Sequence, residues 1–215
     1  MNNYTILYYT MEYENYEIGG EVVTIPVPRS YKDCFILAQS DMYRHQGYLC
    51  SIWRMLYYCM TGRTIAFYFW FRMTCHKGFL YPITKFFLKR FQKRYGIQIY
   101  TSTKIGYGLY IGHFFGTLVH TTSVIGNNVN LFHFTSIGSN GGRGAYIGNY
   151  VHVGPSVSMV GALNVGSKSS IGVGSVVTKD VPPCATVAGV PAKVLTTEHP
   201  ARFIHNPYEF DKNIF

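Results

Sequence analysis

Charged residues are scarce in this chain. Aspartate, glutamate, lysine and arginine together make up 13% of its 215 residues, whereas aromatic residues make up 17%. Disordered chains are rich in charge and poor in aromatic residues, so this composition excludes extended disorder. The length allows one large domain or two small ones, with a sizeable hydrophobic core.

Paired cysteines and clustered histidines are also missing. The five cysteines, at positions 34, 50, 59, 75 and 184, are odd in number, irregular in spacing and form no CxxC pair. This pattern favours neither a disulfide framework nor a zinc site. No two histidines stand four residues apart and carboxylates are few, so we expect no bound metal. We expect buried, free thiols, as in the reducing cytoplasm.

The sequence contains no run long enough to span a membrane. Its most apolar window, residues 65–71, is far shorter than such a span and lies between Arg63 and Arg72. The first ten residues, MNNYTILYYT, contain neither the basic start nor the cleavage site of a secretory signal. We therefore expect a cytoplasmic protein.

The charges that are present are mostly basic. Nineteen lysines and arginines against ten acidic residues give a net charge of +9. This balance suggests an anionic partner, such as a phosphorylated ligand or a membrane surface. No nucleic-acid-binding motif accompanies the charge, so we expect no nucleic-acid partner.

The chain does contain a clear period of six residues between about positions 97 and 195. Eight of the thirteen repeating apolar residues are followed directly by glycine. The period matches neither an α-helix nor an alternating strand, and it is typical of a short-repeat β-solenoid. Three six-residue units would close one triangular turn, which gives about four turns stacked at strand spacing. The repeating residues are Ile99, Ile105, Ile111, Val119, Ile125, Leu131, Ile137, Ile147, Val153, Met159, Val165, Ile171 and Val177.

The period is interrupted twice. The step from Ile111 to Val119 is eight residues, and the step from Ile137 to Ile147 is ten. Extra residues cannot point into a regular prism, so we expect them to bulge outward. Loops on a rigid scaffold are where binding and catalytic residues concentrate. Because three regular units separate the interruptions, we expect the two bulges on similar sides of the prism, one turn apart.

The segments around the solenoid have different patterns. Before it, apolar residues fall at helical spacing, and Ser40-Asp41 would cap a helix that begins at Met42. Further helices are expected over residues 64–75 and 83–95. The chain thus divides into an N-terminal extension with a hairpin turn at Gly19-Gly20 (1–30), an α-helical domain (31–95), the solenoid (96–195) and a C-terminal tail (196–215).

The helix expected over residues 83–95 combines aromatic and basic side chains. Its sequence is ITKFFLKRFQKRY, with Phe86, Phe87 and Phe91 among lysines and arginines. Such a helix suits a peripheral contact with an anionic membrane surface. The alternative is that the phenylalanines pack on the solenoid while the basic face is solvated.

The repeated units, and the closing sequence GSVVTKDVPPCATVAGVPAKV, resemble those of the hexapeptide-repeat acyltransferases. The stretch KIGYGLYIGHFFGTLVHTTSVIGNNVNLFHFTSIG is most similar to the serine acetyltransferase branch. The resemblance covers about residues 31–195. It implies a mainly β fold, namely a left-handed parallel β-helix after a small α-helical region. It also implies acetyl-CoA as donor substrate, a homotrimer, and an active site between neighbouring prisms.

The resemblance further implies a histidine general base, and the matching residue is His113 in the first bulge. An acceptor hydroxyl must lose its proton as it attacks a thioester. An imidazole, whose ordinary pKa is near 6.5, suits that role at neutral pH. A backbone N–H from a corner glycine would stabilise the oxyanion.

Two positions differ from the serine acetyltransferase pattern. That branch carries aspartate directly before the histidine, where this chain has Gly112. It also carries an Arg-His pair that holds the serine carboxylate, where this chain has SNGGRGA, with Arg143 and no histidine. Arg143 could still bind a carboxylate. Relatives that acetylate sugars of surface polysaccharides show such departures, so the small-molecule acceptor is either L-serine or a sugar.

Further site residues follow from position. His120 and His133 lie in turns next to His113, and Asp41 lies in the helical region that reaches the acceptor in this family. The alternative for His120 and His133 is simple exposure to solvent on a face of the solenoid. The alternative for Asp41 is that it caps a helix. The alternative without catalysis is that the chain serves as a scaffold at the membrane surface. For binding CoA we expect Gly138, Ser139, Gly154, Lys179 and Lys193.

Overall fold

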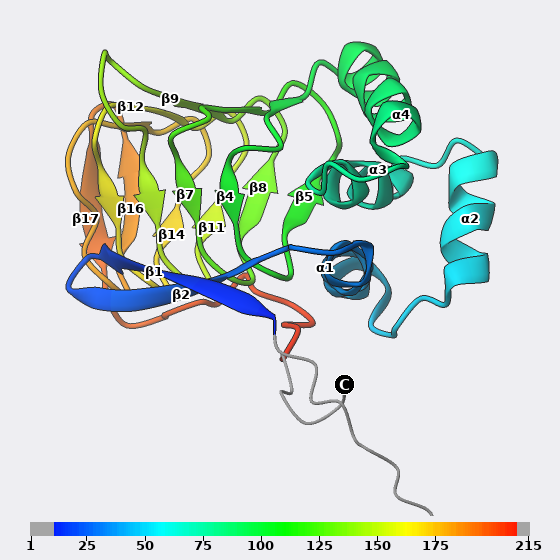
Figure 1. Ribbon diagram of the computed structural model, residues 1–215. Coiled ribbons are helices and arrows are strands. Elements are labelled where there is room, and N and C mark those ends of the chain that lie inside the picture. Colours follow the sequence, from blue (N-terminus) through cyan, green and yellow to red (C-terminus); the bar gives the residue numbers. More distant parts are fainter. Residues whose placement is uncertain (1–10, 210–215) are drawn as a thin grey trace, which may run out of the picture.

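The six-residue repeat forms short strands that stack into a three-sided prism. A computed structural model describes residues 11–209 and places a group of helices at one end of this prism (Figure 1). Every one of the thirteen repeating residues lies in a strand and is at most 4% exposed. The solenoid prediction is therefore confirmed. The expectation of no secretory signal concerns residues 1–10, which lie outside the described residues.

Each side of the prism is one sheet. The strands pair in parallel from turn to turn, so that inward residues form columns, such as Ile105, Ile125 and Ile147. The first face contains β3 (Gln98–Ile99), β6 (Leu118–Val119), β9 (Ser136–Gly138), β12 (Ser158–Val160) and β15 (Val176–Val177). The second face contains β4 (Lys104–Ile105), β7 (Val124–Ile125), β10 (Tyr146–Ile147) and β13 (Asn164–Val165). The third face contains β5 (Tyr110–Gly112), β8 (Asn130–Phe132), β11 (His152–Val153), β14 (Ser170–Ile171), β16 (Thr186–Gly189) and the antiparallel β17 (Ala192–Thr196).

The two interruptions of the period lie at different corners of the prism. The first lies between β5 and β6, where the third face meets the first, and we call this the histidine corner. The second lies between β9 and β10, where the first face meets the second, and we call this the loop corner. The expectation of similar sides is wrong, because Ile137 comes four repeat steps after Ile111. Four steps are one full turn plus one face.

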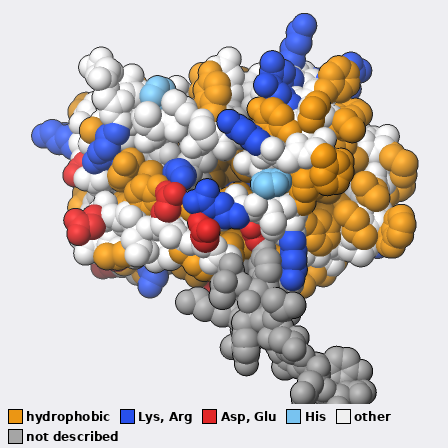
Figure 2. All heavy atoms as spheres, viewed as in Figure 1, with side chains coloured by type: hydrophobic (Ala, Val, Ile, Leu, Met, Phe, Trp, Pro, Cys, Tyr) orange, Lys and Arg blue, Asp and Glu red, His pale blue; other side chains and the backbone are white. Residues whose placement is uncertain are grey.

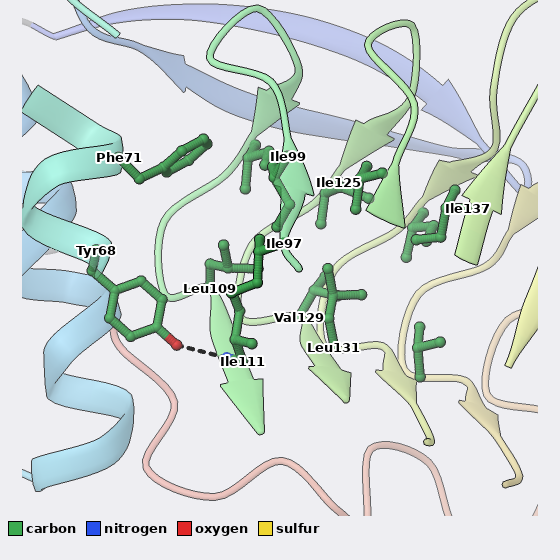
Figure 3. Packing of buried hydrophobic residues seen from close by; sticks show 14 of the residues in the cluster. Tyr68, Phe71, Ile97, Ile99, Leu109, Ile111, Ile125, Val129, Leu131 and Ile137 are labelled. Carbon is green, nitrogen blue, oxygen red and sulfur yellow. Dashed lines mark hydrogen bonds between the residues drawn. The ribbon is translucent and has the colours of Figure 1, made fainter. Parts of the chain in front are cut away.

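Four helices close the N-terminal end of the prism: α1 (Tyr31–Gln46), α2 (Ile52–Met60), α3 (Ala66–Thr74) and α4 (Tyr81–Tyr95). Tyr68 and Phe71 of α3 face the solenoid residues Ile97, Ile99 and Ile111 (Figure 3). The helices and the solenoid therefore share one hydrophobic core.

The first helix begins earlier than its sequence indicated. Ser30 caps α1, because its hydroxyl accepts the N–H of Asp33 while the Asp33 carboxylate accepts the N–H of Ser30. Ser40 and Asp41 lie inside α1, and Gly47 ends the helix in a left-handed conformation. The predicted cap at Ser40-Asp41 is therefore wrong. The helices expected over 64–75 and 83–95 are confirmed within two residues at each end.

A β-hairpin covers the second face of the prism. Its strands are β1 (Glu12–Ile18) and β2 (Glu21–Val27), and the predicted turn at Gly19-Gly20 is confirmed by the positive φ of both glycines. Ile18, Val23 and Ile25 pack against Val124 of β7. The chain thus shields one of the three faces with its own N-terminal segment.

The tail beyond β17 returns along the third face to α1. The carbonyl of Phe203 accepts a hydrogen bond from Asn130, and the carbonyl of His205 accepts one from Arg44. Asn128 exchanges two hydrogen bonds with the backbone of Tyr208. Residues far apart in the sequence therefore meet beside β5 and β8.

Candidate functional site

The histidine corner presents two imidazoles in consecutive turns. Gly112 pairs with Phe132, so His113 lies beside His133 of the next turn. Their ring centres are 5.3 Å apart, and the rings are nearly perpendicular. His113 is exposed and has a φ of 56°. The interruption of the repeat therefore displays His113 to solvent.

The neighbouring side chains explain the glycine before His113. A Cβ at Gly112 would lie 2.5 Å from a carbon of the Phe132 ring. Phe132 thus fills the space next to His113, where a carboxylate at position 112 would otherwise stand. No aspartate or glutamate occurs anywhere between Asp41 and Asp180. His113 consequently has no carboxylate partner from its own part of the sequence.

His133 has an unusual polar atom. Its Nδ1 is buried and has no hydrogen-bond partner among the described residues. Buried polar atoms normally have a hydrogen-bond partner, so this nitrogen is one of the few exceptions among the described residues. The structure brings His133 together with His113, and it places His120 elsewhere.

The loop corner contains His120, Ser139 and Arg143. Nδ1 of His120 lies 2.9 Å from the Thr122 hydroxyl, which also accepts the N–H of Gly144. The Arg143 guanidinium donates to Asn164 at 3.0 Å and lies 4.1 Å above the Tyr146 ring. Arg143 is therefore held against the second face, away from His113.

The predicted acceptor residues are thus divided between two corners of one copy. The corners stand at opposite edges of the first face, whose repeat unit of six extended residues is about 20 Å long. His113 and His133 lie at one edge, whereas His120 and Arg143 lie at the other. A small acceptor cannot touch both groups within a single copy.

The residues expected to bind CoA are divided in the same way. Gly138, Ser139 and Lys179 lie at the loop corner, with Lys179 two turns beyond Ser139. Gly154 lies at the histidine corner, two turns beyond Gly112. Lys193 is exposed in β17, at the far end of the third face. Within one copy, these residues do not form a single site.

Asp41 is not part of an open site. It is fully buried, and its carboxylate accepts two hydrogen bonds from Arg72, at 2.7 and 3.0 Å, and one from the N–H of Leu109. Arg72 also donates to the carbonyls of Ile105 and Gly106. The expectation that Asp41 binds the acceptor is therefore corrected. The pair joins α1 and α3 to the first turn of the solenoid.

A cavity of about 310 Å³ lies beside the histidine corner. It is formed by α1, by outward residues of the third face and by the tail residues Phe203, His205 and Asn206. Sequence reasoning missed it, because nothing local shows that the tail returns to α1. The one available signal was the long stretch without carboxylates that follows Asp41 and contains most of the lining residues. The lining side chains that matter below are Arg44, His45, Tyr110, Asn130, Phe132 and His152.

Two histidines of this cavity have strongly lowered pKa values. Burial lowers the pKa of His45 to about 4, and the neighbouring Arg44 adds to this effect. Burial also lowers the pKa of His152 to about 4, with smaller contributions from Arg202 and His205. Both imidazoles are therefore neutral at pH 7.

These two partly buried histidines predict a loss of stability in mild acid. Between pH 6.5 and 4 the unfolded chain binds protons at these positions and the folded chain does not. The free energy of unfolding therefore decreases as the pH is lowered through this range. The loss amounts to about 3 kcal/mol for each histidine at most. His152→Gln should therefore lose less stability over this range than the parent in urea unfolding, whereas His199→Gln, at an exposed site, should match the parent. Equal losses in His152→Gln and the parent would contradict the prediction.

Among the described residues, no three His, Cys, Asp or Glu side chains gather as metal ligands would. None of the helices in residues 11–209 is both long and apolar enough to cross a membrane.

The chain is similar in sequence to serine acetyltransferases. It is 36% identical to the enzyme of Helicobacter pylori strain J99 over 107 residues, which cover 48% of this chain and 63% of that protein. It is 34% identical to serine acetyltransferase 2 of Arabidopsis thaliana over 110 residues, which cover 49% of this chain and 34% of that protein. The chain thus spans between one third and two thirds of the length of these relatives. No protein-family model matches it.

Solved serine acetyltransferase structures share its fold. The Neisseria gonorrhoeae enzyme superposes with a TM-score of 0.60 at 28% identity, covering 86% of this chain and 70% of that one. A serine acetyltransferase in complex with CoA gives a TM-score of 0.60 at 25% identity, covering 76% of this chain and 70% of that one. The Neisseria gonorrhoeae enzyme in complex with serine gives a TM-score of 0.60 at 28% identity, covering 77% of this chain and 69% of that one. These likenesses confirm the predicted left-handed β-helix and the resemblance seen in the sequence.

Proposed function

We propose that this chain is an acetyl-CoA-dependent O-acetyltransferase in which His113 is the general base. The acceptor is a hydroxyl of L-serine or of a sugar. The observation that carries the proposal is the exposed imidazole of His113, displayed by a break in the repeat of a fold shared with serine acetyltransferases. Solved neighbours in complex with CoA and with serine support the two substrate classes.

The reaction needs one proton to move twice. His113 takes the proton of the acceptor hydroxyl as its oxygen attacks the thioester carbonyl. A backbone N–H at the corner stabilises the negative oxygen that forms. When the C–S bond breaks, His113 returns the proton to the sulfur. The products are an O-acetyl ester and free CoA thiol, so atoms and charges balance.

Acceptor identity is tested by release of thiol from acetyl-CoA. L-serine, neutral sugars and glycan fragments are each compared with a reaction that lacks acceptor. A rate with serine well above the blank supports serine, and a rate with sugars alone supports the sugar. If no acceptor raised the rate above the blank, the proposal would lose its main support.

The active assembly in this proposal is a homotrimer. Its support is the division of the predicted residues between the histidine corner and the loop corner, which a neighbouring copy could bring together. Cyclic trimers use one such contact three times. Sedimentation equilibrium is expected to give three times the chain mass. A fully active monomer would contradict the arrangement.

A second surface supports peripheral contact with an anionic membrane. Trp53 and Met60 of α2 are 77% and 81% exposed, Phe79 before α4 is 82% exposed, and Phe86 on α4 is 63% exposed. Figure 2 shows such apolar side chains over the helical end of the molecule, with lysines and arginines beside them. Phe87, in contrast, stacks on Trp70, so the phenylalanines of α4 do not form one face.

The charges around this surface favour lipid over self-association. No acidic residue lies between positions 42 and 179, whereas α4 alone carries Lys85, Lys89, Arg90, Lys93 and Arg94. Two copies meeting through this surface would bring cations together, whereas anionic headgroups would neutralise them.

The five cysteines are free, which fits a reducing compartment such as the cytoplasm.

Vesicle binding tests this surface. The parent is expected to sediment with anionic vesicles, less so at high salt, and not with neutral ones. The double variant Phe79→Ser/Phe86→Ser should lose most of this binding because it removes two exposed apolar anchors. Val173→Ser, at a 71% exposed site on the solenoid, is the matched control and should bind as the parent does. Equal binding by the double variant would exclude the role.

A further inference from the structure

We infer that the cavity between α1, the third face and the tail is a subsite for an oxyanion, a carboxylate or a phosphate, carried by the acceptor. The inference rests on the proposed function only in assigning the anion to the acceptor. The anion site itself rests on the residues that line the cavity.

Arg44 supplies the positive charge of the cavity. Its side chain is almost fully buried, and its guanidinium donates to Gly108 O at 2.7 Å, Asn130 Oδ1 at 2.7 Å and His205 O at 3.0 Å. All three acceptors are uncharged. A guanidinium carries five N–H bonds, so two remain for a ligand. Burial lowers the pKa of Arg44 to about 10 although Asp41 and nearby tyrosines act in the opposite direction, so the cation is only partly compensated and a bound anion would stabilise it.

Among the described residues, no carboxylate forms a direct ion pair with Arg44. Asp41, one turn earlier on α1, is already paired with Arg72. No aspartate or glutamate lines the cavity. Arg202 and His205 both lower the pKa of the nearby His152, which is the effect of positive charge close to an imidazole. The electrostatic environment therefore favours an anion over a cation.

His45 adds a fixed imidazole to the lining of the cavity. The hydroxyl of Tyr68 accepts the N–H of Ile111 at 2.6 Å, a contact drawn in Figure 3. Nε2 of His45 forms a hydrogen bond with the same hydroxyl at 2.8 Å, which holds the ring in place. Two neighbouring residues of α1 thus bring a guanidinium and an imidazole to the cavity.

Phe132 connects the cavity to the proposed base. Its ring lines the cavity, and its centre lies 6.4 Å from that of His113 and 5.1 Å from that of His152. Tyr110 forms a second flat wall. The cavity and His113 thus contact the same ring, and in this inference the acceptor places its anion on Arg44 and extends past Phe132 toward His113. This arrangement selects acceptors that carry a negative group.

Histidine NMR tests the subsite without any variant. Inorganic phosphate, glucuronate and glucose 6-phosphate are titrated into the full chain, with glucose as the uncharged control. We expect saturable shifts of the His45 and His152 ring signals with at least one anion and none with glucose. The anion that binds distinguishes a carboxylate from a phosphate. Absence of a saturable shift with every anion, or equal shifts with glucose, overturns the inference.

Variants assign the charge to Arg44. Arg44→Gln is expected to weaken anion binding at least tenfold, and Arg63→Gln, at an exposed arginine, is the matched control and should bind as the parent does. If Arg44→Gln does not fold, His152→Gln replaces it and should weaken binding several-fold. Unchanged binding in the folded Arg44 variant overturns the inference.

The thiol-release assay separates the two proposals. Anion binding without acetylation of any acceptor leaves the subsite standing and removes the proposed function. Acetylation of serine or a neutral sugar without anion binding leaves the function standing and removes the subsite.

Discussion

Replacement of His113 by asparagine is expected to lower kcat for acetyl transfer by about 10²–10⁴-fold, the usual contribution of a general base. Asparagine cannot accept the hydroxyl proton at neutral pH. It tolerates the left-handed backbone of this position, where φ is 56°, so the corner should keep its shape. Thiol release measures the rate, and calorimetry with CoA is expected to show unchanged donor binding.

Two further histidine variants sharpen this test. His199→Asn, at an exposed position of the tail, should keep the parent rate. His133→Asn removes the ring that stacks edge-on against His113, and a smaller loss of rate is expected because the base remains. Full activity in His113→Asn, together with loss in His133→Asn, would move the base to His133.

Replacement of Asp41 by asparagine is expected to cost about 3–5 kcal/mol of stability, the usual effect of removing one partner of a buried ion pair. The change leaves the Arg72 guanidinium buried without its counter-charge. Both side chains are at most 3% exposed, so water cannot screen the charge. Urea unfolding followed by circular dichroism measures the loss.

An exposed ion pair provides the control for this prediction. Glu12 contacts Arg29 at 2.7 Å, but both side chains are more than half exposed, so Glu12→Gln should cost less than about 1 kcal/mol. If Asp41 instead bound the acceptor, its replacement would raise KM and leave stability unchanged. That result would restore the role expected from the sequence.

The core of the solenoid could be predicted from the sequence because its contacts repeat. Each inward residue, such as Ile125, packs under a residue of the same kind one turn later, so the period appears directly in the chain. The hairpin at Gly19-Gly20 was also visible, because both residues need a positive φ. Local chemistry decides these features.

Features that depend on distant partners could not be predicted in this way. Asp41 looked like a helix cap because its partner, Arg72, is 31 residues away. The cavity depends on contacts such as that between Asn128 and Tyr208, which are 80 residues apart. The roles of His113, His133, His120 and Arg143 remain predictions, and their division between two corners follows only from the sheet order.

The transfer of a labelled acetyl group tests the central claim most directly. Acetyl-CoA with a ¹³C-labelled carbonyl is incubated with the full chain and each acceptor, and the label is followed by NMR. We predict that the thioester signal declines while an O-acetyl ester signal grows with the parent chain, and that His113→Asn produces almost none. A label that stays on CoA, or appears only as free acetate with every acceptor, would contradict the assignment of this chain as an O-acetyltransferase.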